Sequence, residues 1–173
     1  MAMQMLVAGG LEAVTDSLRT PDDDNPLGYF ELERVKHLKQ DSSWLDEAHG
    51  KVIKVIHLLL MDLPIDRDYR VIFMRRDLSE VVRSQATMLD RSGRRGAGLS
   101  AERLIELFRG QLRTVDGWLA AHPGFQVLSL EHSTFISDPL GQAKVINAFL
   151  GGSLDELAMA RAVKPELHRN RSF

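Results

Sequence analysis

Residues 69 to 84 read Tyr69-Arg-Val-Ile-Phe-Met-Arg-Arg-Asp-Leu-Ser-Glu-Val-Val-Arg-Ser84. The apolar run at 71–74 is typical of a buried strand in a parallel sheet. Two arginines and Asp77 follow at the carboxyl end of this strand, and a helical pattern begins after them. Ligands of open α/β sheets bind at this end of the strands, where helix N-termini favour anions. The segment therefore predicts a strand, an anion-binding corner and a helix, in that order.

Arg76 and Ser84 are the two residues with which this corner can hold a phosphate. The arginine offers a guanidinium fork, and the serine, about two helical turns further on, offers a hydroxyl. The alternative is that Arg75 and Arg76 are solvated residues that form surface ion pairs with Asp77 or Glu80. Both interpretations remain open at this point.

Apolar periodicity and turn residues divide the whole chain into helices and strands that alternate. Ser100 is placed to cap one helix, and Pro139 stands in the first turn of another. The expected helices cover residues 1–9, 29–46, 77–90, 100–122, 138–150 and 153–162, and the expected strands cover 52–57, 71–74 and 125–130. This alternation predicts the α/β class with a parallel sheet.

The composition is that of a globular protein. A length of 173 residues suits a single domain, residues 1–173, and 44% hydrophobic with 27% charged residues excludes a disordered chain. The net charge of -2 argues against a nucleic-acid partner, so an anion site must be local. There is no cysteine, and the six histidines form no pair with metal-ligand spacing, so we expect no metal site.

The first residues resemble neither a signal peptide nor a membrane anchor. No basic residue precedes Arg19, and the apolar run from Met1 is too short to span a bilayer. We therefore expect a cytoplasmic enzyme of bacterial style without a membrane span.

The segment Arg76-Asp77-Leu78 … Ser84 resembles the Arg-Asn/Asp-Pro … Ser element of sulfotransferases that use 3′-phosphoadenosine 5′-phosphosulfate (PAPS). In that family the arginine and the serine eight residues later hold the 3′-phosphate of PAPS or of its desulfated product, PAP. Leu78 stands where the family has proline, at a turn position that contacts no ligand through its side chain. The resemblance implies a P-loop-like, three-layer α/β/α fold.

Three further segments are similar to the same family and follow in the right order. They are Asp24-Asn-Pro-Leu-Gly-Tyr-Phe-Glu31, the strand end Ile56-His57-Leu58, and the series Val127–Leu130, Ser137-Asp-Pro139 and Val145–Gly151. Together with the first segment they cover most of the chain. The ordered set implies transfer of a sulfuryl group from PAPS to a hydroxyl or amine of a small-molecule acceptor, whose identity the sequence does not reveal.

Two residues are candidates for the base that takes the acceptor's proton. The resemblance implies His57, whose intrinsic pKa lies near neutrality; the alternative is a half-buried structural histidine. Glu31 is the second candidate, and its alternative is an ordinary acidic residue in the first turn of a helix. Lys54 stands three residues before His57, so in a strand the two side chains would point to opposite faces.

Arg169 and Arg171 lie in a basic tail. A basic segment near the end of family members folds over the 3′-phosphate, which implies the same role for these two arginines. The alternative is a frayed basic terminus.

The chain contains no Pro-x-Ser-Gly-Thr loop, which in the family cradles the 5′-phosphosulfate after a first strand. We therefore expect a domain that lacks its first strand, with an exposed sheet edge through which a homodimer can form. The alternative function is a non-catalytic remnant that binds a nucleotide or a partner. A kinase of the P-loop class is a third interpretation, although no Gly-x4-Gly-Lys-Ser/Thr is present.

Overall fold

Two parallel strands form the centre of the structure, a computed structural model that describes residues 1–16, 28–91, 93 and 98–164. Strand β1 (Tyr69–Arg75) pairs with β2 (Phe125–Glu131) in a register that places Tyr69 opposite Phe125 and Arg75 opposite Glu131. Both strands therefore end at the same edge. The predicted α/β class with a parallel sheet is confirmed, and the predicted strands at 71–74 and 125–130 are present with one or two additional residues at their ends.

The helices of the described part follow in the order α1, α2, α3, α4, α5, α6, with three 3₁₀-helices before β1. Their bounds are α1 Ala2–Ala8, η1 Glu33–His37, η2 Ser43–Ala48, η3 His57–Asp62, α2 Leu78–Arg91, α3 Ala101–Ala121, α4 His132–Ser137, α5 Pro139–Leu150 and α6 Glu156–Arg161. The predicted cap is confirmed, because Ser100 accepts a hydrogen bond from the Arg103 N–H, and Pro139 stands in the first turn of α5 as predicted. The Asp138 side chain, which was not predicted as a cap, accepts a hydrogen bond from the Gly141 N–H.

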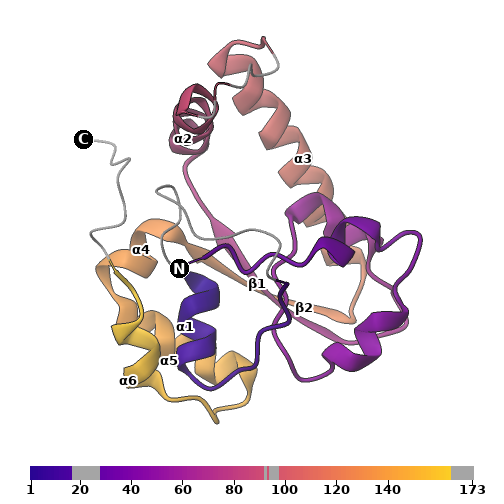
Figure 1. The fold of residues 1–173 in the computed structure, drawn as a ribbon, viewed down its shortest axis with the longest axis vertical. Coiled ribbons are helices and arrows are strands. Elements are labelled where there is room, and N and C mark those ends of the chain that lie inside the picture. Colours follow the sequence, from indigo (N-terminus) through magenta and orange to yellow (C-terminus); the bar gives the residue numbers. More distant parts are fainter. Residues whose placement is uncertain (17–27, 92, 94–97, 165–173) are drawn as a thin grey trace.

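Helical segments cover both faces of the sheet. Alternate side chains of β1 point to opposite faces: Phe73 packs in one hydrophobic cluster, whereas Ile72 and Met74 pack against the other. In Figure 1, α1, α4, α5 and α6 gather on one side, and α3 lies on the other side with the purple segments that precede β1. This arrangement is compatible with an α/β/α layout.

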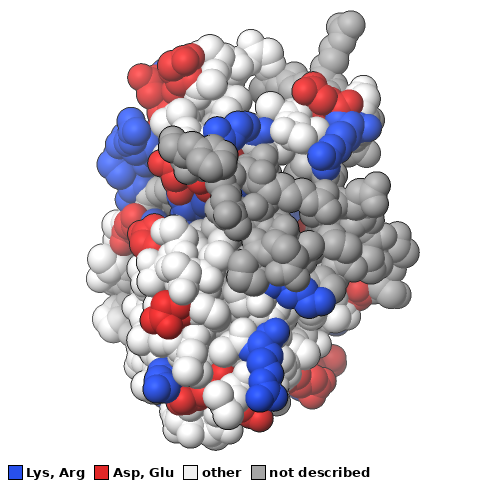
Figure 2. All heavy atoms as spheres, turned by 90° about the vertical axis from the view of Figure 1, so that its left-hand side faces the viewer, with Lys and Arg blue, Asp and Glu red and all other residues white. Residues whose placement is uncertain are grey.

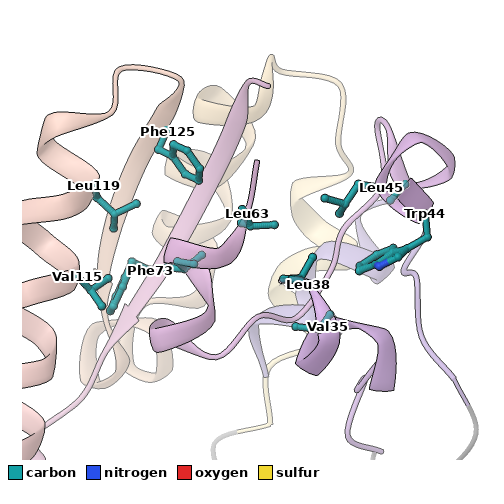
Figure 3. Packing of buried hydrophobic residues seen from close by; sticks show 11 residues of the cluster. Val35, Leu38, Trp44, Leu45, Leu63, Phe73, Val115, Leu119 and Phe125 are labelled. Atoms are coloured by element: carbon teal, nitrogen blue, oxygen red, sulfur yellow. The ribbon is translucent and has the colours of Figure 1, made fainter. Parts of the chain in front are cut away.

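The first cluster joins elements that are far apart in sequence. The 3₁₀-helices and the residues that follow them contribute Val35, Leu38, Trp44, Leu45 and Leu63. Figure 3 shows these residues in one cluster with Phe73, Phe125, Val115 and Leu119. The second cluster contains Met5, Phe135, Ile146 and Met159, all with 0% exposure. The buried apolar area in these two clusters holds the helices against the sheet.

The predicted strand at 52–57 is wrong. Only Val52 forms a bridge, with Ala13, and His57 already begins η3. The reason is that no neighbouring strand continues alongside this segment. The Val14 N–H bonds to the Val52 carbonyl, but two residues later the Asp16 N–H bonds to the Glu31 carbonyl instead, at 3.0 Å. Residues beyond Val52 thus have no strand to pair with among the described segments.

The predicted helix at 29–46 is also wrong, because it is divided into η1 and η2. Phe30 adopts a left-handed conformation with φ of 52°, which an α-helix does not accommodate. The Asp41 carboxylate accepts hydrogen bonds from the N–H and the hydroxyl of Ser43, at 3.0 and 2.6 Å. Such local side-chain bonds compete with the helical ladder and begin a new turn.

One helix was not predicted. The residues of α4 follow β2 directly, and Phe135 at its centre is fully buried in the second cluster. Within the described residues each strand of the sheet pairs on one side only. The homodimer through such an edge stays a prediction.

Candidate functional site

The edge where β1 and β2 end carries the arginines of the predicted corner, and α2 begins there. The side chain of Arg75 is not free to bind a ligand at this corner, because it is held by two contacts. Its guanidinium lies 3.9 Å from the centroid of the Phe73 ring and contacts the Asp116 carboxylate of α3 at 2.5 Å. Arg75 therefore joins the sheet to α3, which leaves Arg76 as the arginine of the corner.

Arg76 is held by one contact. Its Nε atom lies 3.2 Å from Oε2 of Glu80, and the two side chains are 27% and 12% exposed. The terminal nitrogens of Arg76 make no hydrogen bond with any residue in the described ranges. An ion pair between Arg76 and Glu80 is what the alternative to phosphate binding predicted, and the structure contains it, although the two side chains are mostly buried rather than solvated. The pair fixes the guanidinium, while the outer edge of the guanidinium stays available to an acceptor oxygen.

Asp77 caps α2. Its Oδ1 atom accepts hydrogen bonds from the N–H groups of Ser79 at 2.8 Å and Glu80 at 3.2 Å, and also from the Ser79 hydroxyl. The hydrogen bond from the Ser79 hydroxyl, followed by that from the Glu80 N–H, lowers the pKa of the Asp77 carboxyl. The first turn of α2 is therefore occupied by a carboxylate of the chain, so an external anion at this corner would bind to side chains.

Ser84 lies two turns into α2. Glu80 and Ser84 are four residues apart and therefore lie on one face of the helix, and Arg76, which precedes the helix, reaches this face through its contact with Glu80. Ser84 is half-buried, and its hydroxyl makes no hydrogen bond within the part of the chain that the structure describes. These three side chains thus form a row with an oriented guanidinium at one end and an unused hydroxyl at the other, and with the Glu80 carboxylate between them.

His57 contacts α3. Its Nε2 atom lies 3.3 Å from Oε1 of Gln111, and the ring is half-buried. An amide oxygen only accepts hydrogen bonds, so in this contact Nε2 is the donor, and in a neutral ring Nδ1 then has the lone pair. A base acting at this position would use Nδ1.

Glu31 lies in a different environment. Lys54 donates to the Tyr29 carbonyl at 3.0 Å and lies 3.4 Å from the Glu31 carboxylate. The charge of Lys54 also acts on the Met1 amino group. The pKa of this amino group is lowered mainly by burial and secondly by the positive charge of Lys54. The two candidate bases thus contact different parts of the fold: Glu31 pairs with Lys54, and His57 bonds to α3.

Three interaction partners were not expected from the sequence. Asp116 binds Arg75, Gln111 binds His57, and Lys54 binds Glu31. Gln111 carries a weak signal, because it is a polar residue between the apolar positions Phe108 and Leu112 of α3. For Asp116 and for the Lys54–Glu31 pair, the sequence contains no comparable signal.

Some predicted residues lie outside the described ranges. These are Arg169 and Arg171 in the tail and residues 24–27 of the segment Asp24–Glu31 that resembles the family. Among the residues that are described, no group of three His, Asp or Glu side chains is placed to hold a metal ion, and no helix has the length and apolarity to cross a membrane. On the face shown in Figure 2, basic and acidic side chains of the described residues are interspersed.

Comparison of the chain with protein-family models, with curated proteins and with solved structures gives no match.

Proposed function

We propose that this chain binds the 3′-phosphate of PAPS or PAP through Arg76 and Ser84, and that it has the function of a PAPS-dependent sulfotransferase. The observation that carries the proposal is the row on α2. Arg76 is oriented by Glu80 through Nε alone, and the hydroxyl of Ser84 has no bond to a described residue.

The donor set of this row fits a phosphate. The terminal nitrogens of an arginine and a hydroxyl two turns away supply charge-assisted hydrogen bonds to phosphate oxygens. The location also fits, since ligands of parallel sheets bind beyond the carboxyl ends of the strands. A P-loop-like fold, with helices on both faces of a parallel sheet, is the architecture that we infer on the same grounds.

PAPS, when bound, supplies an activated sulfuryl group. The chain must then take a proton from the attacking hydroxyl, and Nδ1 of His57 is the atom that we assign to this step. The hydrogen bond to Gln111 fixes the tautomer that leaves this atom unprotonated. Glu31 is the alternative base, and its carboxylate pairs with Lys54 at 3.4 Å.

A second candidate function is nucleotide binding without transfer. His57 bonds to Gln111 of α3, and Glu31 pairs with Lys54, so these contacts of the two candidate bases lie away from the Arg76–Ser84 row. If the two regions do not cooperate, the chain binds a 3′-phosphorylated nucleotide and transfers nothing. Release of labelled sulfate to an acceptor would exclude this alternative.

Thermal unfolding with and without PAP tests the binding. At a concentration of one hundred times Kd, a ligand that binds only the folded chain adds about 2.7 kcal/mol, which corresponds to a rise in Tm of roughly 5–10 °C for a chain of this size. We expect this rise for the wild type and for Arg161→Ala, which removes an exposed arginine from α6.

Arg76→Ala should abolish the rise. Because this change also removes the arginine that pairs with Glu80, the double variant Arg76→Ala, Glu80→Ala is needed as a second probe that removes both members of the pair. Absence of a PAP-dependent rise in the wild type, or an undiminished rise in both variants, would exclude the proposed site.

A further inference from the structure

Arg75, the last residue of β1, attaches the proposed phosphate corner to α3. Its guanidinium lies 3.9 Å from the centroid of the Phe73 ring and 2.5 Å from the carboxylate of Asp116. Phe73 is 7% exposed and belongs to the first hydrophobic cluster, so one of the two contacts is anchored in the core. The side chain of Arg75 is 22% exposed, which distinguishes its ion pair from one that is fully solvated.

Asp116 has a fixed position because of its neighbours on α3. Val115, directly before it, is 0% exposed, and Leu119 is 5% exposed; both belong to the first cluster. This buried face holds α3 in place, and Asp116 lies at its margin with a half-exposed side chain. The helix, which Figure 1 shows along one side of the sheet, thus gives the end of β1 a rigid support.

Arg76 follows Arg75 directly, so a planar peptide unit links the two residues. The pair between Arg75 and Asp116 therefore fixes the point from which the Arg76 side chain starts. Glu80 holds the other end of that side chain through Nε. An arginine that is fixed at both ends loses less conformational freedom when its terminal nitrogens bind a ligand.

We infer that Asp116 is a positioning residue of the phosphate corner, which acts through Arg75 to hold Arg76 in place for a phosphate monoester. This inference deepens the proposed function and rests on it, because the ligand is the 3′-phosphate assigned to Arg76 and Ser84. Asp116 carries a charge of the same sign as that phosphate. Charge and positioning therefore predict opposite effects of its removal, since loss of repulsion strengthens PAP binding and loss of support weakens it.

Calorimetric titration with PAP separates the two effects. Asp116→Ala removes both the charge and the contact, and we expect the Kd of PAP to rise about tenfold. Asp116→Asn removes the charge but keeps an oxygen that accepts from Arg75, so its Kd should equal that of the wild type or be lower. Glu106→Ala breaks a different ion pair of α3, with Arg103, and should leave the Kd unchanged. An unchanged or lower Kd in Asp116→Ala would overturn the inference.

A variant of Arg75 tests whether Asp116 acts through this residue. The double variant Arg75→Ala, Asp116→Ala should raise the Kd of PAP by much less than the product of the two single effects, because each single change already breaks the same contact. Two effects that multiply in full would show independent action and would also overturn the inference.

A second measurement needs no nucleotide. The Nε–H group of Arg76 donates to Glu80, which slows exchange of its hydrogen with water, and NMR spectra of arginine side chains report this rate. Asp116→Ala should accelerate the exchange at least about fivefold, whereas Asp116→Asn and Glu106→Ala should keep the wild-type rate. The Tm of each variant without ligand establishes that every sample is folded at the temperature used.

The two measurements distinguish failure of this inference from failure of the proposed function. PAP binding by the wild type with unchanged exchange in Asp116→Ala would remove Asp116 from the corner and leave the phosphate site in place. Faster exchange in Asp116→Ala, without PAP binding by the wild type, would contradict the proposed function and support the positioning of Arg76 by Asp116.

Discussion

Arg76 and Glu80 form an ion pair one helical turn apart, with Nε of the arginine 3.2 Å from Oε2 of the glutamate, at the point where β1 passes into α2. The pair orients the guanidinium, but it also places a negative charge next to the proposed phosphate site. These two effects oppose each other in anion binding, and they can be separated by mutation.

Glu80→Gln should raise the affinity for PAP. Glutamine keeps the size and a hydrogen-bond acceptor for Arg76, and it removes the repulsion between a carboxylate and the 3′-phosphate. We expect Kd to fall by about threefold to tenfold in calorimetric titrations at low salt. Glu47→Gln removes an exposed carboxylate from η2 and should change nothing. Weaker binding by Glu80→Gln would mean that orientation outweighs repulsion.

Ser84→Ala should weaken PAP binding by about tenfold to a hundredfold, the effect of losing one hydrogen bond to a charged group. Thr87→Ala is the matched control, because its hydroxyl already donates to the Arg83 carbonyl on the same helix. The measurement is the Kd of PAP at fixed ionic strength. Equal Kd values for both variants would remove Ser84 from the site.

Asp77 should make the stability of the chain depend on pH in the acid range. Hydrogen bonds from the Ser79 hydroxyl and the Glu80 N–H lower the pKa of Asp77 in the folded state. The stabilisation is therefore fully present above the pKa of the unfolded chain and is lost as the pH falls through the lower folded value. Asp77→Ala should have a lower Tm than the wild type at pH 7, and the two Tm values should converge as the pH is lowered toward 3. Asp90→Ala, an exposed acid in the same helix, should not show this convergence.

His57→Ala should abolish sulfuryl transfer without weakening PAP binding. Removal of a positioned base costs about 10²–10⁴ in rate. Glu31→Gln should leave the rate within a few fold, because Glu31 pairs with Lys54 rather than with an acceptor. Labelled sulfate transfer measures the rate, and thermal shift measures PAP binding. The opposite ranking of the two variants would assign the base to Glu31.

Gly9→Ala should destabilise the chain by about 1–3 kcal/mol. An added Cβ would lie 2.6 Å from Cγ and 2.9 Å from Sδ of Met159, a side chain with 0% exposure. Gly117→Ala is the control within α3. No atom lies near its Cβ position, so the better helix propensity of alanine should stabilise the chain by about 0.5–1 kcal/mol. Urea denaturation of the three proteins gives both values.

The corner at residues 75–84 shows how far local sequence can predict a site. The strand, the helix, the Arg76–Glu80 pair and the alignment of Ser84 all follow from spacing along one short segment. The capping of α2 by Asp77 needs only neighbouring residues as well. The role of Arg75 cannot be predicted from neighbouring residues, because its partner Asp116 is 41 positions away, on α3.

The segment between residues 28 and 63 shows where prediction from the sequence ends. Its apolar spacing indicated a helix and a strand, but the structure contains three short 3₁₀-helices and a single bridge. Weak local preferences there are overridden by burial of side chains such as Trp44 and Leu45 in the first hydrophobic cluster.

The sequence by itself determined the two parallel strands, the long helices α2, α3 and α5, and the caps at Ser100 and Asp138. These features depend on residues within one or two turns of each other. Only the tertiary structure decided that His57 bonds to Gln111, 54 positions away, and that Glu31 pairs with Lys54, 23 positions away. A hydrogen bond forms only where folding brings its two groups together, and the packing of both faces of the sheet sets that arrangement.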